Sequence, residues 1–268
     1  MLKTIRRLFE RQESAHPEAS LPSGQRVYAV GDIHGRLDLF EAMIAAIEAD
    51  DATSGAADTT VILLGDLVDR GPDSAGVIDR ARAWQRQRKV RILAGNHEEM
   101  FLQSFKKTEI LKHFLRFGGK ETVLSYGVDR QAYQTASIEE VQAMMHAAVP
   151  AEDRAFLDAF EDMIALGDYL FVHAGIAPQV PFEEQRTNDL RWIREPFLSH
   201  SESFGAVVVH GHTITDEPQD RGNRIGIDTG AYLSGRLTAL VLEGTSRRFL
   251  TVSDEDGSLS AAARELAA

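Results

Sequence analysis

Residues 60–71 read TVILLGDLVDRG. An apolar, β-branched run leads into a glycine, and two aspartates and an arginine follow it. A continuous apolar run of this length predicts a strand that is buried on both faces, as in a parallel sheet. The polar residues then fall at the carboxyl end of the strand, which is where α/β sheets form their sites.

Four further stretches repeat this pattern of an apolar run that breaks at small and polar residues. They are YAVGDIHG at 28–35, VRILAGNHE at 90–98, YLFVHAG at 169–175 and AVVVHGHT at 206–213. Helical patterns at 37–50 and 74–89 separate the first three of the five predicted strands. Alternating strands and helices predict an α/β fold with a largely parallel sheet.

The rest of the chain has other patterns. Residues from about 98 to 167 have helical periodicity with acidic starts and a break at Gly118–Gly119, which predicts a helical cap inserted beside the sheet. Strands return at 224–230, 236–244 and 247–253, and we expect these three to be antiparallel. Residues 1–24 are predicted to be a flexible segment before a domain at 25–253, and residues 254–268 a tail or loose helix.

Composition limits the class of protein. The chain has 268 residues, 43% of them hydrophobic, which suits one large domain. No stretch approaches 18 consecutive apolar residues, so we predict no membrane partner, and the basic N-terminus lacks the apolar core of a secretory signal. The absence of cysteine excludes disulfides and Cys-ligated zinc and suits a cytoplasmic location. A net charge of −12 argues against a nucleic-acid partner.

The polar residues at the five predicted strand ends would share one edge of the sheet. They combine carboxylates, imidazoles and one amide: Asp32, His34, Asp66, Asp69, Asn96, His97, His173, His210 and His212. A single aspartate after a strand is usually a cap or turn residue. So many ligand types at successive strand ends instead predict a metal site, and carboxylate with imidazole favours Mn, Fe, Zn, Co or Ni over Ca or Mg.

Charge counting predicts what such a site would attract. Two metal ions about 3.5–4 Å apart need a bridging carboxylate, and such pairs clamp phosphoryl groups. Two divalent ions bring four positive charges, whereas Asp32 and Asp66 return two and an amide at Asn96 returns none. The site would remain positive and would attract a phosphate dianion into an acidic protein.

In this order and spacing, GDIHG, GDLVDRG, GNHE, VHAG and HGHT resemble the calcineurin-like metallophosphoesterases of the phosphoprotein phosphatase type. The likeness to compact bacterial and phage serine/threonine phosphatases extends to FGGKET at 117–122, WIRE at 192–195 and IDTGAYLSGRLT at 227–238. It covers roughly residues 26–245. It implies two mixed β-sheets packed face to face as a sandwich with helices outside.

The resemblance also implies a role for each site residue. One metal would take Asp32, His34 and a bridging Asp66, and the other would take Asp66, Asn96, His173 and His212. The expected ions are two Mn²⁺, with Fe, Zn, Ni or Co as alternatives, and a hydroxide between them would attack phosphorus. His97 would be the general acid and Asp69 would hold its ring. Arg70 and Arg194 would bind the phosphate oxygens, next to Asn96 and His97.

Several neighbours of the motifs have simpler interpretations. We expect His210 to be structural, Arg191 to be a surface charge, and Asp228 to be a turn residue near the site. Glu98 could support His97, although an acidic residue at the start of a helix needs no such role. Asn96 and His97 would lie in an extended loop, where adjacent side chains point to opposite sides. The amide could then face the metals and the imidazole the substrate.

Three functions remain open from the sequence. The first is a serine/threonine protein phosphatase that acts on phosphoproteins or on small phosphoesters. The second is a dinucleoside polyphosphate hydrolase, because HAGIAPQ at 173–179 resembles a segment of the symmetrical diadenosine tetraphosphate hydrolases. Such a substrate needs stacking aromatics, which the cap offers: Phe105, Phe114, Phe117, Tyr126 and Tyr133. The third is a non-catalytic metal-binding regulatory protein, which would lack a ligand, and no ligand is missing. The oligomeric state is left open.

Overall fold

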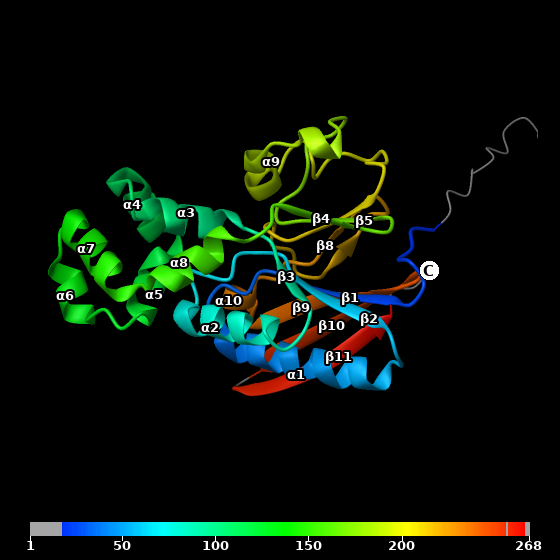
Figure 1. The fold of residues 1–268 in the computed structure, drawn as a ribbon, viewed down its shortest axis with the longest axis horizontal. Coiled ribbons are helices and arrows are strands. Elements are labelled where there is room, and N and C mark those ends of the chain that lie inside the picture. Colours follow the sequence, from blue (N-terminus) through cyan, green and yellow to red (C-terminus); the bar gives the residue numbers. More distant parts are fainter. Residues whose placement is uncertain (1–17, 256, 266–268) are drawn as a thin grey trace, which may run out of the picture.

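The computed structural model describes residues 18–255 and 257–265 (Figure 1). Its centre is a six-stranded mixed sheet in the order β11-β10-β9-β1-β2-β3. The strands are β1 (Gln25–Val30), β2 (Asp58–Leu63), β3 (Val90–Ile92), β9 (Arg236–Glu243), β10 (Ser246–Glu255) and β11 (Ser258–Glu265). β1, β2 and β3 are parallel, and β9 joins β1 in the antiparallel sense. The predicted parallel unit is therefore confirmed.

A second mixed sheet packs on the first. Its order is β4-β5-β6-β8-β7. The strands are β4 (Met163–Leu166), β5 (Tyr169–Val172), β6 (Val207–His210), β7 (Gln219–Asp220) and β8 (Arg224–Gly226). Ala29, Ile62 and Leu240 of the first sheet meet Phe171 and Val209 of the second in one buried core. The predicted sandwich is confirmed.

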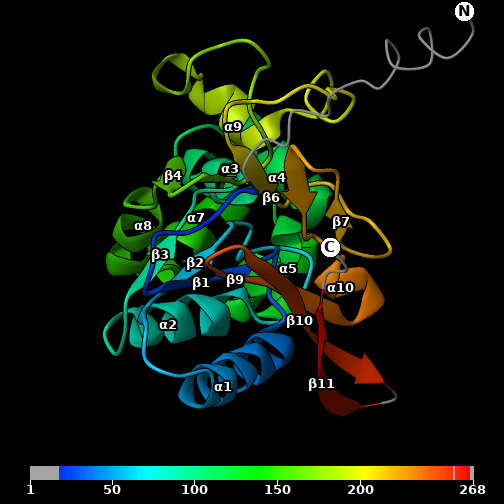
Figure 2. The ribbon, with the colours of Figure 1, turned by 90° about the vertical axis from the view of Figure 1, so that its right-hand side faces the viewer.

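Alternating residues of β1 show why its apolar run is continuous. Val27 and Ala29 face the second sheet, whereas Tyr28 and Val30 face the helices. α1 (Leu37–Thr53) and α2 (Ser74–Gln85) connect the parallel strands and cover that outer face (Figure 2). On the outer side of the second sheet, Leu170 and Val208 pack against loops around η2 (Phe182–Glu184) and α9 (Thr187–Trp192).

The predicted cap is a cluster of helices at one end of the sandwich (Figure 1). Its elements are α3 (Asn96–Ser104), α4 (Thr108–Phe114), the π-helical turn η1 (Leu115–Gly119), α5 (Lys120–Ser125), α6 (Arg130–Thr135), α7 (Ile138–Ala148) and α8 (Ala151–Asp158). Phe101, Leu111, Phe114, Val123 and Met145 form a separate core for these helices. The helical prediction is wrong at its end, because residues 163–166 form strand β4.

The C-terminal prediction is also wrong. Residues 258–265 form β11, which pairs with β10 along its whole length instead of forming a tail or helix. The unpaired backbone of β10 outweighs the helix propensity of an alanine-rich segment. Likewise β8 is antiparallel to β7 but parallel to β6, so the prediction of uniformly antiparallel C-terminal strands holds only for β9 and β10.

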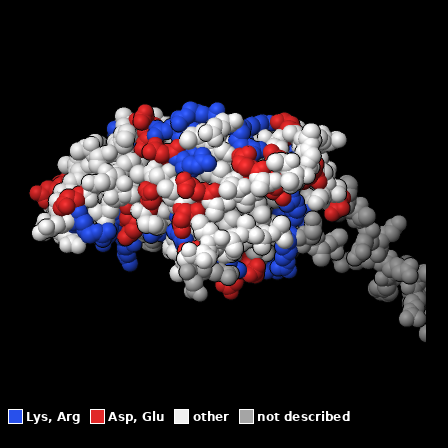
Figure 3. Space-filling model, turned by 90° about the horizontal axis from the view of Figure 1, so that it is seen from below, with Lys and Arg blue, Asp and Glu red and all other residues white. Residues whose placement is uncertain are grey.

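The N-terminal prediction can be compared only in part, because residues 1–17 lie outside the described residues. Residues 18–24 are packed on the domain, since the Leu21 side chain is buried and its N–H donates to the Gly244 carbonyl. No helix of the described residues is long and apolar enough to cross a membrane. Acidic and basic side chains are interspersed over the described surface that Figure 3 shows.

Candidate active site

The predicted site residues come together at one edge of the sandwich. Those that follow β1, β2, β3, β5 and β6 are all buried: Asp32, His34, Asp66, Asp69, Asn96, His97, His173 and His212. β1, β2 and β3 belong to the first sheet and β5 and β6 to the second, so the expectation of one shared sheet is wrong, although residues after all five strands meet at the same edge of the sandwich. The predicted residues therefore do lie close together, whereas the role of each one stays a proposal.

The loops at this edge have unusual backbone conformations. His34, Asp66, Asp69, Arg70 and His212 all have positive φ, between 47° and 74°. Residues other than glycine rarely adopt this left-handed region, because each costs about 1–3 kcal/mol and persists only where the surroundings impose it. Such strain gathers at functional sites. The chain thus stores strain at predicted site residues, both ligands and their neighbours, and Gln179 is the only other case among the described non-glycine residues.

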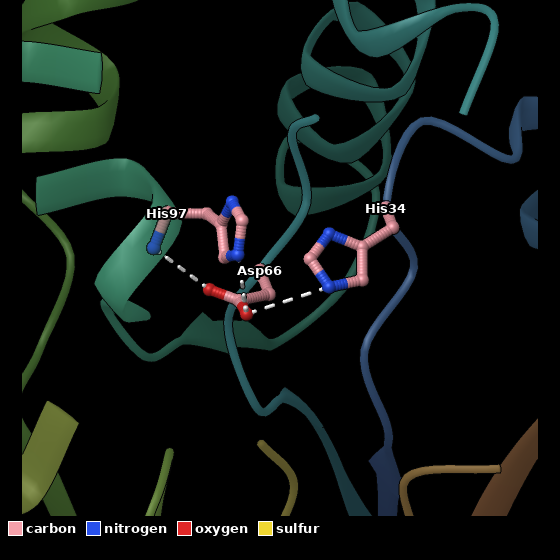
Figure 4. A group of neighbouring side chains, drawn as sticks. All are labelled: His34, Asp66 and His97. Atoms are coloured by element: carbon pink, nitrogen blue, oxygen red, sulfur yellow. Dashed lines mark hydrogen bonds and ion pairs between the residues drawn. The ribbon is translucent and has the colours of Figure 1, made fainter. Parts of the chain in front are cut away.

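Asp66 lies at the centre of the cluster. Its Oδ2 is 3.5 Å from His34 Nε2 and 3.5 Å from His173 Nε2, and its Oδ1 accepts the His97 N–H at 3.0 Å. Figure 4 shows His34 and Asp66 on separate loops, meeting His97 at the start of α3. One carboxylate therefore faces two imidazoles, which follow two different strands. A ligand shared by two metal ions would need this position.

The Asn96 side chain is a second point at which side chains from different loops meet. Its Oδ1 lies 3.0 Å from His173 Nε2 and 2.8 Å from His212 Nδ1. His173 Nδ1 lies 2.8 Å from the Leu64 carbonyl, so this nitrogen carries the proton and Nε2 presents a lone pair to the amide oxygen. Two acceptors that face each other repel unless a cation lies between them. The arrangement fits a metal ion.

His34 has the same protonation pattern. Its Nδ1 lies 2.8 Å from the Val68 carbonyl, which leaves the Nε2 lone pair directed at Asp66. A backbone carbonyl that fixes the tautomer in this way is usual behind metal-ligating histidines. Buried His212 Nε2 has no hydrogen-bond partner among the described residues. The donor set of carboxylate, imidazole and amide suits a divalent transition ion better than an all-oxygen site.

Burial controls the electrostatics of the cluster. It raises the pKa of Asp66 to about 6 and, with Asp228 and Asp66 nearby, raises the pKa of Asp32 well above its usual range. It lowers the pKa of His173 to about 4 and that of His212 to about 2. The protein alone thus favours neutral groups here, and a bound cation would stabilise the ionised carboxylates.

Two motif glycines allow the carboxylates to pack so closely. A Cβ on Gly211 would lie 2.0 Å from Asp32 Oδ1, and a Cβ on Gly95 would lie 2.1 Å from Asp66 Oδ1. Glu98 fixes the same loop, since its carboxylate accepts the N–H groups of Gly95, Asp66 and Leu67. This role of Glu98 differs from the expected support of His97. Glu98 stands three residues after the N-cap Gly95 and accepts its N–H, but glycine has no capping side chain, so the sequence GNHE carries no capping-box signal for this role.

His97 belongs to a second group of residues. Its Nδ1 lies 2.6 Å from Asp69 Oδ2, and its Nε2 lies 2.9 Å from Arg70 Nη2. Asn96 and His97 are the first two residues of α3, so the expected extended loop is wrong. Their side chains still diverge, because successive residues on a helix point about 100° apart. Distance alone does not separate His97 from the ligands, since His34, Asp66 and His97 offer atoms within 4.8 Å of one another.

A cavity of about 570 Å³ opens over these residues. Arg70 and Arg194 both line it, together with Trp192 and Tyr232. The Arg70 guanidinium lies 4.8 Å from the centre of the Tyr232 ring, a cation–π contact that the sequence analysis missed. Arg194 Nη2 donates to the His212 carbonyl at 3.4 Å. The cavity therefore offers two guanidinium groups to an anion next to the buried cluster.

The neighbouring residues agree with their simpler interpretations. Arg191 forms an ion pair with Asp162 at 2.6 Å. His210 points away from the cluster, with Nδ1 at 3.0 Å from the Gly211 carbonyl and Nε2 at 3.3 Å from Arg224. Asp228 accepts the Gly230 N–H in a turn, but it is also buried close enough to raise the pKa of Asp32.

Comparison with known proteins points to one family. Residues 25–235 match the family described as Calcineurin-like phosphoesterase. The chain is 25% identical to serine/threonine-protein phosphatase 1 of Salmonella typhimurium, over 85% of this chain and 97% of that protein. It is 24% identical to the asymmetrical bis(5'-nucleosyl)-tetraphosphatase of Oceanobacillus iheyensis, over 80% of this chain and 87% of that protein. The fold is similar to that of a cold-active protein-tyrosine phosphatase of a Shewanella species, with a TM-score of 0.55, 19% identity, and coverage of 91% and 82%.

Proposed function

This chain belongs to the calcineurin-like phosphoesterase family, and we propose that it hydrolyses phosphate monoesters at a pair of divalent metal ions, with phosphoserine and phosphothreonine of proteins as substrates. The observation that carries the proposal is the Asp66 carboxylate, which faces His34 and His173 at equal distances beside the Asp69–His97 pair. Hydrolysis of a phosphate ester with a poor leaving group requires bound metal ions and, beside them, an imidazole fixed in position to donate a proton.

We propose that the ligands form two metal sites that share Asp66. Asp32, His34 and Asp66 would hold one, and Asp66, Asn96, His173 and His212 would hold the other. Mn²⁺ is the expected metal, and Fe, Zn, Ni and Co suit the same ligands. When bound, such ions supply positive charge to the phosphoryl oxygens and lower the pKa of a water molecule.

The remaining side chains bind the substrate and deliver a proton. Arg70 and Arg194 line the cavity and would donate to two phosphate oxygens in the planar geometry that guanidinium favours. Arg70 also donates to His97 Nε2 in this structure. A phosphate that draws Arg70 away would leave this nitrogen free to hold a proton for the leaving oxygen, while Asp69 keeps Nδ1 bonded.

A direct assay tests the proposal. The manganese-loaded protein should hydrolyse p-nitrophenyl phosphate and release phosphate from a phosphothreonine peptide. The same preparation should be assayed with Mg, Zn, Ni and Co, and with diadenosine tetraphosphate. Metal binding without turnover of any phosphoester would refute the enzymatic proposal and support a non-catalytic binding protein instead.

One observation favours a dinucleoside polyphosphate as a second candidate substrate. Phe117 is 44% exposed, and its ring contacts the His113 ring in a tilted arrangement with the centroids 4.4 Å apart; both residues line the cavity. A neighbouring cavity of about 420 Å³ shares Met100, His113 and Trp192 with it. A nucleobase could lie against this aromatic rim. The tetraphosphatase relative supports this candidate, and a higher kcat/KM for diadenosine tetraphosphate than for the phosphopeptide would select it.

The four other cap aromatics offered by the sequence do not supply that rim. Phe105, Phe114, Tyr126 and Tyr133 pack in the core of the cap. A cap of this size needs its own apolar core, and these residues provide it. Of the five aromatics, Phe117 is therefore the one that the structure offers to a substrate base.

Replacing Arg194 by alanine should lower kcat/KM for p-nitrophenyl phosphate by about 10- to 100-fold. The reason is that a hydrogen bond to a charged group contributes about 1.5–3 kcal/mol. Arg191→Ala is the matched control, because Arg191 lies three residues away and pairs with Asp162. We expect the control to stay within about twofold, as is usual for positions outside a site. Equal losses in the two variants would remove Arg194 from the phosphate site.

Asn96→Ala should weaken metal binding by about 10- to 100-fold, in line with the effect of removing groups that support a metal site. After desalting, elemental analysis should find about one metal ion per chain where the unchanged protein retains about two. Asn188→Ala, at an exposed asparagine, is the control and should retain the full complement. A full complement in Asn96→Ala would exclude the amide from the ligands.

A further inference from the structure

The loop that carries Asp69 and Arg70 is held in its strained form by the helical cap. Both residues have left-handed φ, at 74° and 69°. The Asp69 N–H donates to Thr122 Oγ1 at 2.9 Å, and the Arg70 N–H donates to the Gly118 carbonyl at 3.0 Å. Consecutive left-handed residues persist only where their surroundings fix them. Both of these bonds come from one segment of the cap, η1 and α5, and the Asp69 N–H is shared with Ser74 Oγ of α2 at 3.0 Å.

Thr122 also bonds the Asp69 side chain. Its hydroxyl lies 2.6 Å from Asp69 Oδ1 and donates its single proton to that carboxylate. Ser74 Oγ lies 2.9 Å from Thr122 Oγ1 and, since the threonine proton is already used, serine is the donor in that bond. The other Asp69 oxygen bonds His97 Nδ1 at 2.6 Å. The result is a continuous chain from Ser74 through Thr122 and Asp69 to His97.

This chain of bonds is closed to solvent. Ser74, Thr122 and Asp69 have no exposed surface, and His97 is 1% exposed. A buried carboxylate needs a hydrogen bond at each oxygen, and an oxygen left without one is costly. Thr122 is the described side-chain donor to Oδ1, whereas His97 occupies Oδ2. Without the threonine hydroxyl, the carboxylate could turn and the imidazole would lose its fixed orientation.

Gly118 explains why the cap segment fits so closely. A Cβ at this position would lie 2.6 Å from Arg70 Cγ and 2.8 Å from Arg70 N, and its φ of 110° already favours glycine. Gly118 lies in the kink between α4 and α5, four residues before Thr122, and both residues bond the backbone of the loop that carries Asp69 and Arg70. The GGKET segment thus has a physical reason for both its glycine and its threonine.

We propose that Thr122 is a positioning residue for the Asp69–His97 pair, so that the cap completes the proton-donating side of the site as well as forming a wall of the cavity. The inference rests on the proposed role of His97 as proton donor. It assigns to the cap a part in the chemical step that goes beyond the selection of substrates.

Thr122→Val tests the proposal, because valine keeps the shape of threonine and removes the hydroxyl. We expect kcat for phenyl phosphate, a poor leaving group, to fall by up to about 100-fold, the size of effect that follows from misplacing a catalytic group by about 1 Å. KM and metal content should stay unchanged, and p-nitrophenyl phosphate should show a much smaller loss. Thr122→Ser restores the hydroxyl and should recover the activity. Thr238→Val is the control, since Thr238 is equally buried but bonds Thr229 and Thr251.

A double variant separates positioning from general damage. In a His97→Ala background, Thr122→Val should cause no further loss, because the group that it positions is gone. Equal losses with both substrates, a loss that persists in the His97→Ala background, or full activity of Thr122→Val would each overturn the inference. If the valine variant fails to fold, Thr122→Ala gives the same comparison. Full activity of Thr122→Val beside an active unchanged protein refutes only this inference, whereas absence of turnover by the unchanged protein refutes the proposed function.

Discussion

Asp66→Asn will abolish hydrolysis of p-nitrophenyl phosphate, with kcat/KM falling by about 1,000-fold, at the upper end of losses for a preorganised electrostatic group. Asp66 Oδ2 is 3.5 Å from both His34 Nε2 and His173 Nε2, and no other carboxylate among the described residues lies within 4 Å of both nitrogens. An amide keeps the shape of the side chain but removes one of the two anionic charges proposed to balance two divalent ions. The ions should then be lost together.

The measurement is metal content and turnover on the same sample. Elemental analysis should find less than one ion per chain in Asp66→Asn after desalting. Asp38→Asn is the matched control, because Asp38 is a half-exposed carboxylate that pairs with Arg36 outside the cluster. It should keep its metal and stay within about twofold of full activity. A variant at Asp66 that retains two ions and turns over substrate would show that this carboxylate does not bridge the metals.

Most of the site could be predicted because of a simple property of parallel strands. Their carboxyl ends share an edge, so polar residues after buried apolar runs are brought together whatever lies between them. Asp32 follows β1 of the first sheet and His212 follows β6 of the second, 180 residues later, and because the two sheets pack face to face the His212 N–H still donates to the Asp32 carboxylate at 3.0 Å. The continuous apolar runs of β1 and β2 were recognisable as strands because both faces of these strands are covered.

The features that could not be predicted depend on tertiary contacts, which leave no periodic pattern in the sequence. The alanine-rich segment of β11 looks helical by propensity, and only the open edge of β10 makes it a strand. Thr122 lies 53 residues from Asp69 in another part of the fold, and nothing in its spacing connects the two. Glu98 had a simpler explanation as the acidic start of a helix, although it also bonds the backbone of the Asp66 loop.

His97→Ala will lower kcat by an amount that depends on the leaving group of the substrate. General acid catalysis contributes about 100- to 10,000-fold when the leaving group is poor, so we expect kcat for phenyl phosphate to fall by about 1,000-fold. The p-nitrophenolate ion leaves without a proton, so the loss with p-nitrophenyl phosphate should stay below about tenfold. His200→Ala, at a half-buried histidine whose ring contacts Phe204 outside the site, is the control and should affect turnover of neither substrate.

The same variant decides between the two roles that geometry allows for His97. Its Nε2 lies 4.0 Å from Asp66 Oδ2, and it forms a potential ligand group with His34 and Asp66. A metal ligand at this position would, on removal, lower metal content and reduce turnover equally for both substrates. Removal of a proton donor would leave the metal content intact and would reduce turnover much more for phenyl phosphate than for p-nitrophenyl phosphate. The two roles exclude each other, because a metal-bound imidazole nitrogen carries no proton to give. The bond from Asp69 to Nδ1 and the contact of Nε2 with Arg70, on the cavity side, lead us to expect the second result.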